Sequence, residues 1–226
     1  MLAPAVTHAH VSISSGPAAA NKSGQLITFS VGHGCTDAAM THLDTIKVRV
    51  AIPAGVTSVR PLRSDFGTPT VIRTGATITH VEWTKPVAEL LEGDDAYYQL
   101  TIRAKVDNLP FSRLQFAVEQ TCQNKTTNAQ TVVLWDQPPG TMTGSPAALL
   151  TVIPQRVPGW NAITIPAGTT VPAAELGTYF GDAAIVWRGS SAYSANAVTA
   201  GMIAATPGVT PLAADLVAGD ELYVKY

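Results

Sequence analysis

Alternation of apolar and polar residues is the feature of this sequence that most restricts its fold. In the segment YYQLTIRAKV (97–106), Tyr98, Leu100, Ile102 and Ala104 fall on one side, and the more polar residues between them fall on the other. A two-residue period is that of a β-strand, because successive side chains of a strand point to opposite faces of its sheet. The segment is therefore predicted to be a strand with one face against a core.

Similar segments recur between residues 10 and about 137. They read LITFSV, IKVRVAIP, TVIRTGATITHVEW, LQFAVEQTC and TVVLW, and turn-forming clusters such as PAGV and LEGDD lie between them. Short strands at regular spacing are typical of an antiparallel β-sandwich. We therefore expect a mainly β fold, with an immunoglobulin- or fibronectin-like sandwich over residues 10–137.

The sequence changes character after this region. The stretch DQPPGTMTGSPAA is rich in proline and glycine, and we predict a linker at 138–149. Beyond it, VPAAELGTYF and SANAVTAGMIAAT are helix candidates, the second with an Asn or Ser cap at its start. GWNAITIPAG, AAIVWRG and DELYVKY are strand candidates. Residues 150–226 are therefore predicted to form a small α+β unit.

Composition excludes several classes of function. Charged residues make up 13% of the chain, the net charge is −2, and lysine and arginine do not cluster. Binding of nucleic acid or of an anionic membrane surface requires a basic patch, so neither partner is expected. The chain has no apolar run long enough for a transmembrane helix. It lacks the GxSxG, HExxH, P-loop and GxGxxG signatures, and we expect no enzymatic activity.

The first nine residues, MLAPAVTHA, are similar to the end of a secretory signal. Thr7 and Ala9 are small residues at positions −3 and −1 of a cleavage site before His10. The charged and fully apolar parts of such a signal are missing, so residues 1–9 are interpreted as its remnant. Cleavage would give His10 a free α-amine, which together with the ring Nδ1 can chelate one Cu(II) ion. Without cleavage that nitrogen is an amide, and the chelate cannot form.

Export also bears on the two cysteines, Cys35 and Cys122. They could be two buried thiols or one disulfide. Because disulfides persist in oxidising compartments outside the cytosol, we predict a bridge within the sandwich.

Seven segments in order resemble a known family. They are HVSI, FSVGHGC, IKVRVAIPAGVTSVRP, HVEWT, YYQLTIRAKV, LQFAVEQTC and VVLWD. Together they are similar to the YcnI-like family of exported bacterial copper-binding domains over about residues 10–137. The tail resembles an extension found in some members.

The resemblance implies a one-histidine brace for copper. His10 matches the chelating N-terminal histidine, and Trp135 matches a tryptophan over the metal. Some members have a glutamate where this chain reads GHGC, so Asp37 or His33 is expected to substitute as the further ligand. The residues alone also allow other roles, with Trp135 in the core, Asp37 capping a turn and His33 making a structural hydrogen bond.

The leading hypothesis is thus a periplasmic or extracellular Cu(II)-binding protein in copper trafficking or homeostasis, with other exported or membrane copper-handling proteins as partners. One alternative is an N-terminal-histidine copper monooxygenase, which needs a second histidine. His33, His42 and His80 are available but do not match that pattern. Another is an extracellular interaction module without metal, whose function would not depend on His10.

Overall fold

The structure is a computed structural model that describes residues 11–91, 96–139 and 145–226. These residues form two compact units. The first, the sandwich unit, contains the described residues of 11–16, 23–105 and 114–150. The second, the C-terminal unit, contains 17–22, 106–113 and 151–226. The C-terminal unit is therefore discontinuous in sequence.

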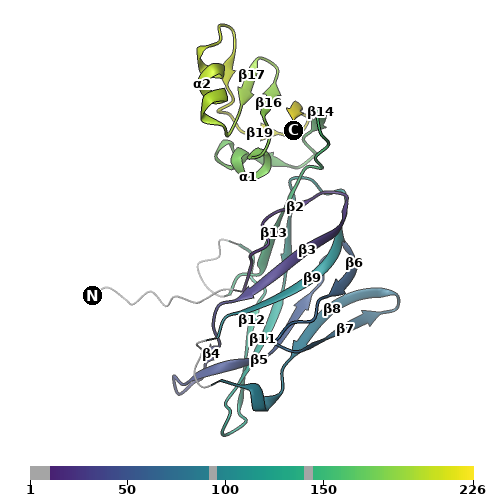
Figure 1. Ribbon diagram of the computed structural model, residues 1–226, viewed down its shortest axis with the longest axis vertical. Coiled ribbons are helices and arrows are strands. Elements are labelled where there is room, and N and C mark those ends of the chain that lie inside the picture. The colour runs from purple at the N-terminus through teal and green to yellow at the C-terminus, as the bar shows by residue number, and fades with distance from the viewer. Residues whose placement is uncertain (1–10, 92–95, 140–144) are drawn as a thin grey trace, which may run out of the picture. The chain divides into compact units, whose positions relative to one another are not determined.

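The largest sheet of the sandwich unit has the strand order β12-β11-β5-β8-β7, with β4 also paired to β5 (Figure 1). Every neighbouring pair in this sheet is antiparallel. Its strands are β4 (Cys35–Thr36), β5 (His42–Ala51), β7 (Thr68–Thr74), β8 (Thr77–Thr84), β11 (Val118–Gln123) and β12 (Gln130–Trp135).

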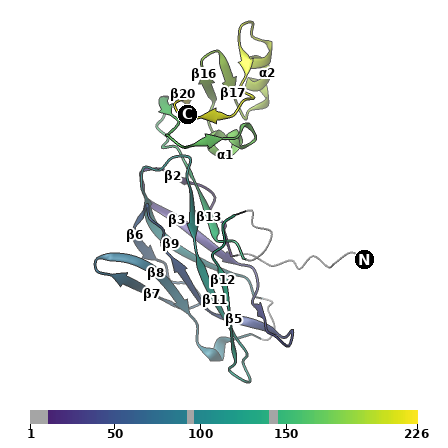
Figure 2. The same cartoon turned by 180° about the vertical axis from the view of Figure 1, so that it is seen from behind.

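Two further sheets have the orders β1-β3-β9-β6 and β10-β13-β2, and Figure 2 shows β2, β3, β6, β9 and β13 from behind. In the first of these sheets, β1 and β3 are antiparallel. In the second, β13 and β2 are parallel. The strands are β1 (Ser12–Ile13), β2 (Ala18–Ala19), β3 (Lys22–Val31), β6 (Val56–Pro61), β9 (Tyr98–Val106), β10 (Arg113–Phe116) and β13 (Ala148–Ile153). A 3-10 turn, η1 (Val87–Glu89), follows β8.

The core of the sandwich unit follows the predicted alternation. Leu100, Ile102 and Ala104 of β9 are buried, whereas the residues between them are partly or fully exposed. Phe29 packs edge-on against Phe116, with ring centroids 5.2 Å apart, an arrangement that aromatic pairs favour. The predicted antiparallel sandwich is confirmed.

The C-terminal unit is a small α+β unit, as predicted. Its five-stranded sheet has the order β14-β20-β16-β17-β18, and β15 pairs with β19. The strands are β14 (Trp160–Thr164), β15 (Thr170–Val171), β16 (Ile185–Arg188), β17 (Ser191–Tyr193), β18 (Thr210–Pro211), β19 (Leu216–Val217) and β20 (Glu221–Lys225). The helices are η2 (Ala173–Glu175), α1 (Leu176–Phe180) and α2 (Ala197–Ala205).

Helix α2 begins at the asparagine cap that its sequence indicates. Asn196 accepts hydrogen bonds from the backbone N–H groups of Val198 and Thr199, which have no partner within the helix. Helix α1 contributes Leu176 and Phe180 to the core of this unit. No helix in the described parts of the chain is long and apolar enough to cross a bilayer.

Candidate metal centre

Trp135, the last residue of β12, points into the sandwich. It pairs with Val118 of β11, which in turn pairs with Val50 of β5, and only 3% of its surface is exposed. The preceding residue, Leu134, lies on the opposite face and is 54% exposed. The indole Nε1 donates a hydrogen bond to Oε1 of Gln120, with 3.0 Å between the two atoms.

Gln120 of β11 uses both ends of its side-chain amide. While Oε1 accepts from Trp135, Nε2 donates to the backbone oxygen of His33 at 2.9 Å and to Oγ1 of Thr45 at 2.8 Å. Gln120 is almost fully buried, and a buried polar group left unmatched is costly. This glutamine, which was not among the predicted site residues, therefore joins two that were, Trp135 and His33.

A signal for Gln120 is present in the sequence. It stands two residues before Cys122 in VEQTC, so the strand period places the two side chains on the same face. Once Cys122 is assigned to a buried bridge, Gln120 must be buried as well. Such a glutamine needs polar partners inside the fold.

His33 is half-buried, and its tautomer follows from one contact. The ring Nδ1 lies 2.5 Å from the carbonyl oxygen of Gly34, and since a carbonyl only accepts, Nδ1 must donate. The lone pair of the neutral ring is then on Nε2, the arrangement usual for histidines that bind metals. Gly34 itself is required here, because a Cβ at this position would overlap the carbonyl oxygen of Leu43.

The predicted disulfide is confirmed between Cys35 and Cys122. Cys35 is on β4, and β4 pairs with β5 at Leu43. Oγ1 of Thr45 lies 3.8 Å from the sulfur of Cys122. The bridge therefore anchors the segment just after His33 to the strand that carries Gln120.

Asp37 caps a turn, which is one of the two roles that the sequence left open for it. Its Oδ1 accepts hydrogen bonds from the backbone N–H groups of Ala39 at 2.9 Å and Thr41 at 2.8 Å. This carboxylate holds the turn between β4 and β5, an ordinary role for aspartate. Gln120 connects His33 and Trp135, whereas these contacts of Asp37 lie within its own turn.

His10 lies outside the described residues, and so does the predicted signal remnant at 1–9. The described chain starts at Val11, which is buried, and Ser12 pairs with Ser30 of β3. Within the described ranges, no three His, Cys, Asp or Glu residues form a group that could hold a metal ion.

Comparison with known proteins decides the family. A domain of unknown function, DUF1775, matches residues 10–152, more than half of the chain. The chain belongs to the DUF1775 family. This is the YcnI-like domain that the sequence motifs indicated. No curated protein matches the chain.

Among solved structures, this DUF1775 chain is similar to an uncharacterized protein from Nocardia farcinica with an immunoglobulin-like fold. The TM-score is 0.51 and the identity 23%, over 63% of this chain and 97% of the other. Domains D2 and D3 of the major pilin SpaD from Corynebacterium diphtheriae give a TM-score of 0.38 and 13% identity, over 71% and 56% of the two chains. The full-length pilin gives 0.37 and 11%, over 71% and 38%. The first match supports an immunoglobulin-like fold for the DUF1775 domain.

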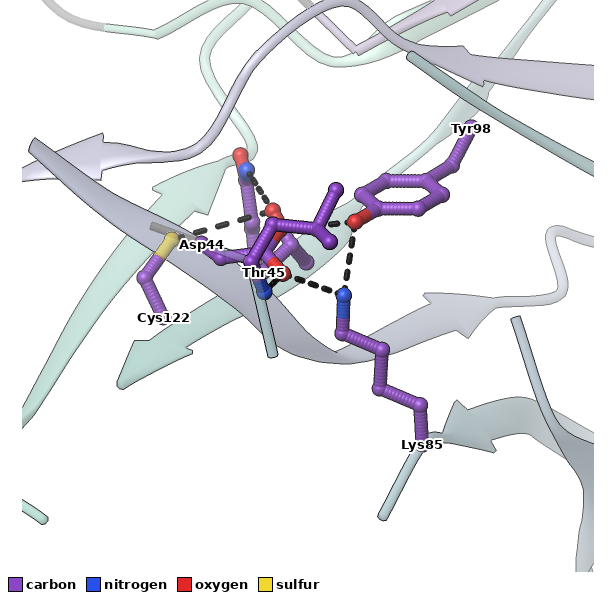
Figure 3. A network of polar contacts seen from close by, with 7 residues as sticks. Asp44, Thr45, Lys85, Tyr98 and Cys122 are labelled. Carbon is purple, nitrogen blue, oxygen red and sulfur yellow. Dashed lines mark hydrogen bonds and ion pairs between the residues drawn. The ribbon is translucent and has the colours of Figure 1, made fainter. Parts of the chain in front are cut away.

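A second polar network lies inside the DUF1775 domain (Figure 3). Asp44 of β5 accepts a hydrogen bond from the hydroxyl of Tyr98 at Oδ1, and at Oδ2 from the backbone N–H of Leu91 and from Nζ of Lys85. Lys85 also donates to the Tyr98 hydroxyl at 2.6 Å. Burial first, and then the hydrogen bond and charge of Asp44, raise the pKa of Tyr98 above its ordinary value.

The outer face of the largest sheet has a different character. Lys47 forms an ion pair with Glu119 at 3.5 Å, and a cavity of about 320 Å³ is lined by residues including His80 and Arg49. Burial and the Arg49 charge lower the pKa of His80. His80 pairs with Ala51, one residue beyond Val50, so it faces away from the side on which Trp135 lies.

Proposed function

We propose that the exported, mature form of this DUF1775 protein binds one Cu(II) ion and acts in copper trafficking or homeostasis. The α-amine and Nδ1 of His10 form the chelate, and Trp135 lies beside the metal. The observation that carries the proposal is the hydrogen-bonded connection from Trp135 through Gln120 to His33, because it joins two of the predicted site residues in one rigid arrangement.

The course of the chain supports a place for His10 in this arrangement. Strand β1 is antiparallel to β3, and Ser12 pairs with Ser30. Going backward along β1 therefore corresponds to going forward along β3, which ends at Val31 just before Gly32 and His33. His10 directly precedes Val11 in sequence, and the proposal requires it to reach the His33 segment.

His33 is the better candidate for the further ligand. Its Nδ1 donates to the Gly34 carbonyl, so Nε2 carries the lone pair that a metal needs. Nitrogen donors of this kind suit Cu(II), which has the highest affinity among the divalent metals of the first transition row. Asp37 has one carboxylate oxygen engaged in its turn, and we assign it that structural role.

The disulfide supports a location in the periplasm or outside the cell, because such bridges are rare in the cytosol. We infer export from it together with the cleavage-site pattern before His10. Partners would then be exported or membrane-bound copper-handling proteins. We propose no catalytic role, and His80 faces away from Trp135, so it does not complete a two-histidine site there.

Copper titration of three forms with defined N-termini tests the proposal. They are the protein starting at His10, the form that retains residues 1–9, and the His10→Ala variant starting at residue 10. The exposed His42→Ala variant of the mature form is the matched control. We expect the mature form and its control to bind one Cu(II), and the other two to bind at least about tenfold more weakly. Equal affinity in all forms would refute the proposal.

A further inference from the structure

The buried Asp44 and Lys85 form, with the half-buried Tyr98, a cluster that copper binding does not use. The side chains of Lys85 and Asp44 are 4% and 1% exposed, whereas those of Lys47 and Glu119 are 31% and 32% exposed. Lys85 directly follows β8, Asp44 is on β5, and Tyr98 is the first residue of β9. The cluster therefore joins three strands of the sandwich unit (Figure 3).

The surroundings of Lys85 are aromatic. Its Nζ lies 4.6 Å from the centroid of the Tyr98 ring and 5.5 Å from that of Phe66. The two rings pack edge-on with centroids 4.8 Å apart, and Phe66 is buried. Removing an ammonium and a carboxylate from water into such a site is costly, even when they pair. An amide between the same two groups carries no charge.

We propose that Lys85 and Asp44 condense into an intramolecular isopeptide bond. In the ion pair, the ammonium first gives one proton to Oδ2, which leaves a neutral amine and a neutral carboxyl group. Nζ then attacks Cγ, the N–C bond forms, and the C–Oδ2 bond breaks. A second amine proton goes to the departing hydroxyl. The third stays on the amide nitrogen, so the only product released is one water molecule.

Donors are already present at both oxygens of Asp44. The Tyr98 hydroxyl lies 2.7 Å from Oδ1, where it stabilises the negative charge that develops on this atom as Nζ attacks. The N–H of Leu91 lies 2.8 Å from Oδ2, the oxygen that leaves. A surface pocket of about 180 Å³, lined in part by Asp44 and Leu91, offers an exit for the water. Tyr98 therefore contacts the reacting groups directly and acts as a catalytic residue in this scheme.

The bond would add a second covalent link next to the disulfide. Asp44 and Lys85 are 41 residues apart in sequence. Thr45, the neighbour of Asp44 on β5, lies against Cys122 of the disulfide. The disulfide joins β4 to β11, and the proposed bond would join β5, which pairs with both of these strands, to the residue that follows β8.

Intact-mass spectrometry of the reduced, denatured full chain tests the proposal. We expect a mass lower than that of the sequence by one water molecule. Fragmentation should then identify a peptide in which Lys85 and Asp44 are joined. The Lys85→Met variant should have the full mass, whereas the exposed Lys125→Met control should retain the deficit.

A wild-type chain with its full sequence mass overturns the proposal and identifies the contact as an ion pair only, whether or not Lys85→Met folds. A deficit that persists in Lys85→Met overturns it as well. The Tyr98→Phe variant adds a kinetic test on newly synthesised chain, because a bond that has already formed would survive unfolding and refolding. We expect the linked fraction to form about a hundredfold more slowly, while the unlinked chain still folds. An unchanged rate would contradict the role given to Tyr98.

Discussion

The indole Nε1 of Trp135 and Oε1 of Gln120 are joined by a 3.0 Å hydrogen bond inside the sandwich. The same glutamine holds the backbone of His33 and the hydroxyl of Thr45. The side-chain amide of Gln120 therefore fixes Trp135 of β12, the backbone of His33 before β4 and the side chain of Thr45 on β5 relative to one another. The orientation of the proposed copper site depends on a residue that does not itself bind the metal.

Replacing Gln120 with leucine should destabilise the fold. Trp135 Nε1 loses this acceptor, and the His33 carbonyl and Thr45 lose a donor, around a side chain that is almost fully buried. We expect the free energy of unfolding to fall by about 1–3 kcal/mol or more, measured by denaturant titration. The control Gln99→Leu, at an exposed position of β9, should change it by less than about 0.5 kcal/mol. Similar losses in both variants would contradict the assignment.

Copper affinity should distinguish His33 from Asp37. His33→Gln removes the ring nitrogen and should weaken Cu(II) binding by the mature form about tenfold or more. Asp37→Asn keeps an Oδ1 acceptor for Ala39 and Thr41 and should leave the affinity unchanged within about twofold. Competition with a chelator of known affinity measures both. The reverse ranking would assign the ligand role to Asp37.

Removing the disulfide should cost a large part of the stability. The bridge joins residues 87 positions apart, and in the chain-entropy account closing such a loop stabilises the fold by about 4–5 kcal/mol. The Cys35→Ala/Cys122→Ala double variant should therefore unfold at much lower denaturant concentration than the oxidised protein. Addition of reductant should shift the wild type toward the variant and leave the variant itself unchanged.

Stability should also fall in alkali because of Tyr98. Burial raises the pKa of this phenol in the folded chain, so above about pH 10 the unfolded chain loses a proton that the folded chain retains. The free energy of unfolding then decreases as the pH rises past that value. Tyr98→Phe should flatten this decrease, whereas Tyr223→Phe, at an exposed position, should not. Parallel curves for the two variants and the wild type would refute the assignment.

The strands were predictable because their signal is local. In YYQLTIRAKV the buried residues are those that the alternation selects, and a hydrophobic core enforces this period along the whole strand. The cap of α2 was predictable for a similar reason, since Asn196 acts on the two N–H groups that follow it directly. The disulfide needed one further inference, that of an oxidising compartment.

The candidate site was less accessible from sequence because its contacts are distant. Gln120 and the His33 carbonyl are 87 residues apart, and no local pattern reports that they meet. For Asp37 the sequence left open a turn cap or a ligand, and the contacts to Ala39 and Thr41 show the cap. The assignment of copper itself stays a prediction, because it depends on His10.

The division of the chain was also hidden from local patterns. Proline and glycine predict a single boundary at 138–149, whereas residues 17–22 and 106–113 pack with 151–226. Phe111, for example, lies against Tyr179 and Phe180, with centroids 5.3 and 5.9 Å away. A composition rich in turn-forming residues indicates a linker. It does not indicate which segments before the linker pack against the segment after it.

This discontinuity has a consequence for the order of events at the ribosome. The N–H of Ala20 donates to the carbonyl of Ile153, and that of Asn21 to the carbonyl of Asp107. Residues 17–22 thus have partners that are synthesised well after them. Because folding during synthesis proceeds from the N-terminus, residues 17–22 must wait for the rest of their unit. The C-terminal unit is completed only after residues 151–226 have been synthesised.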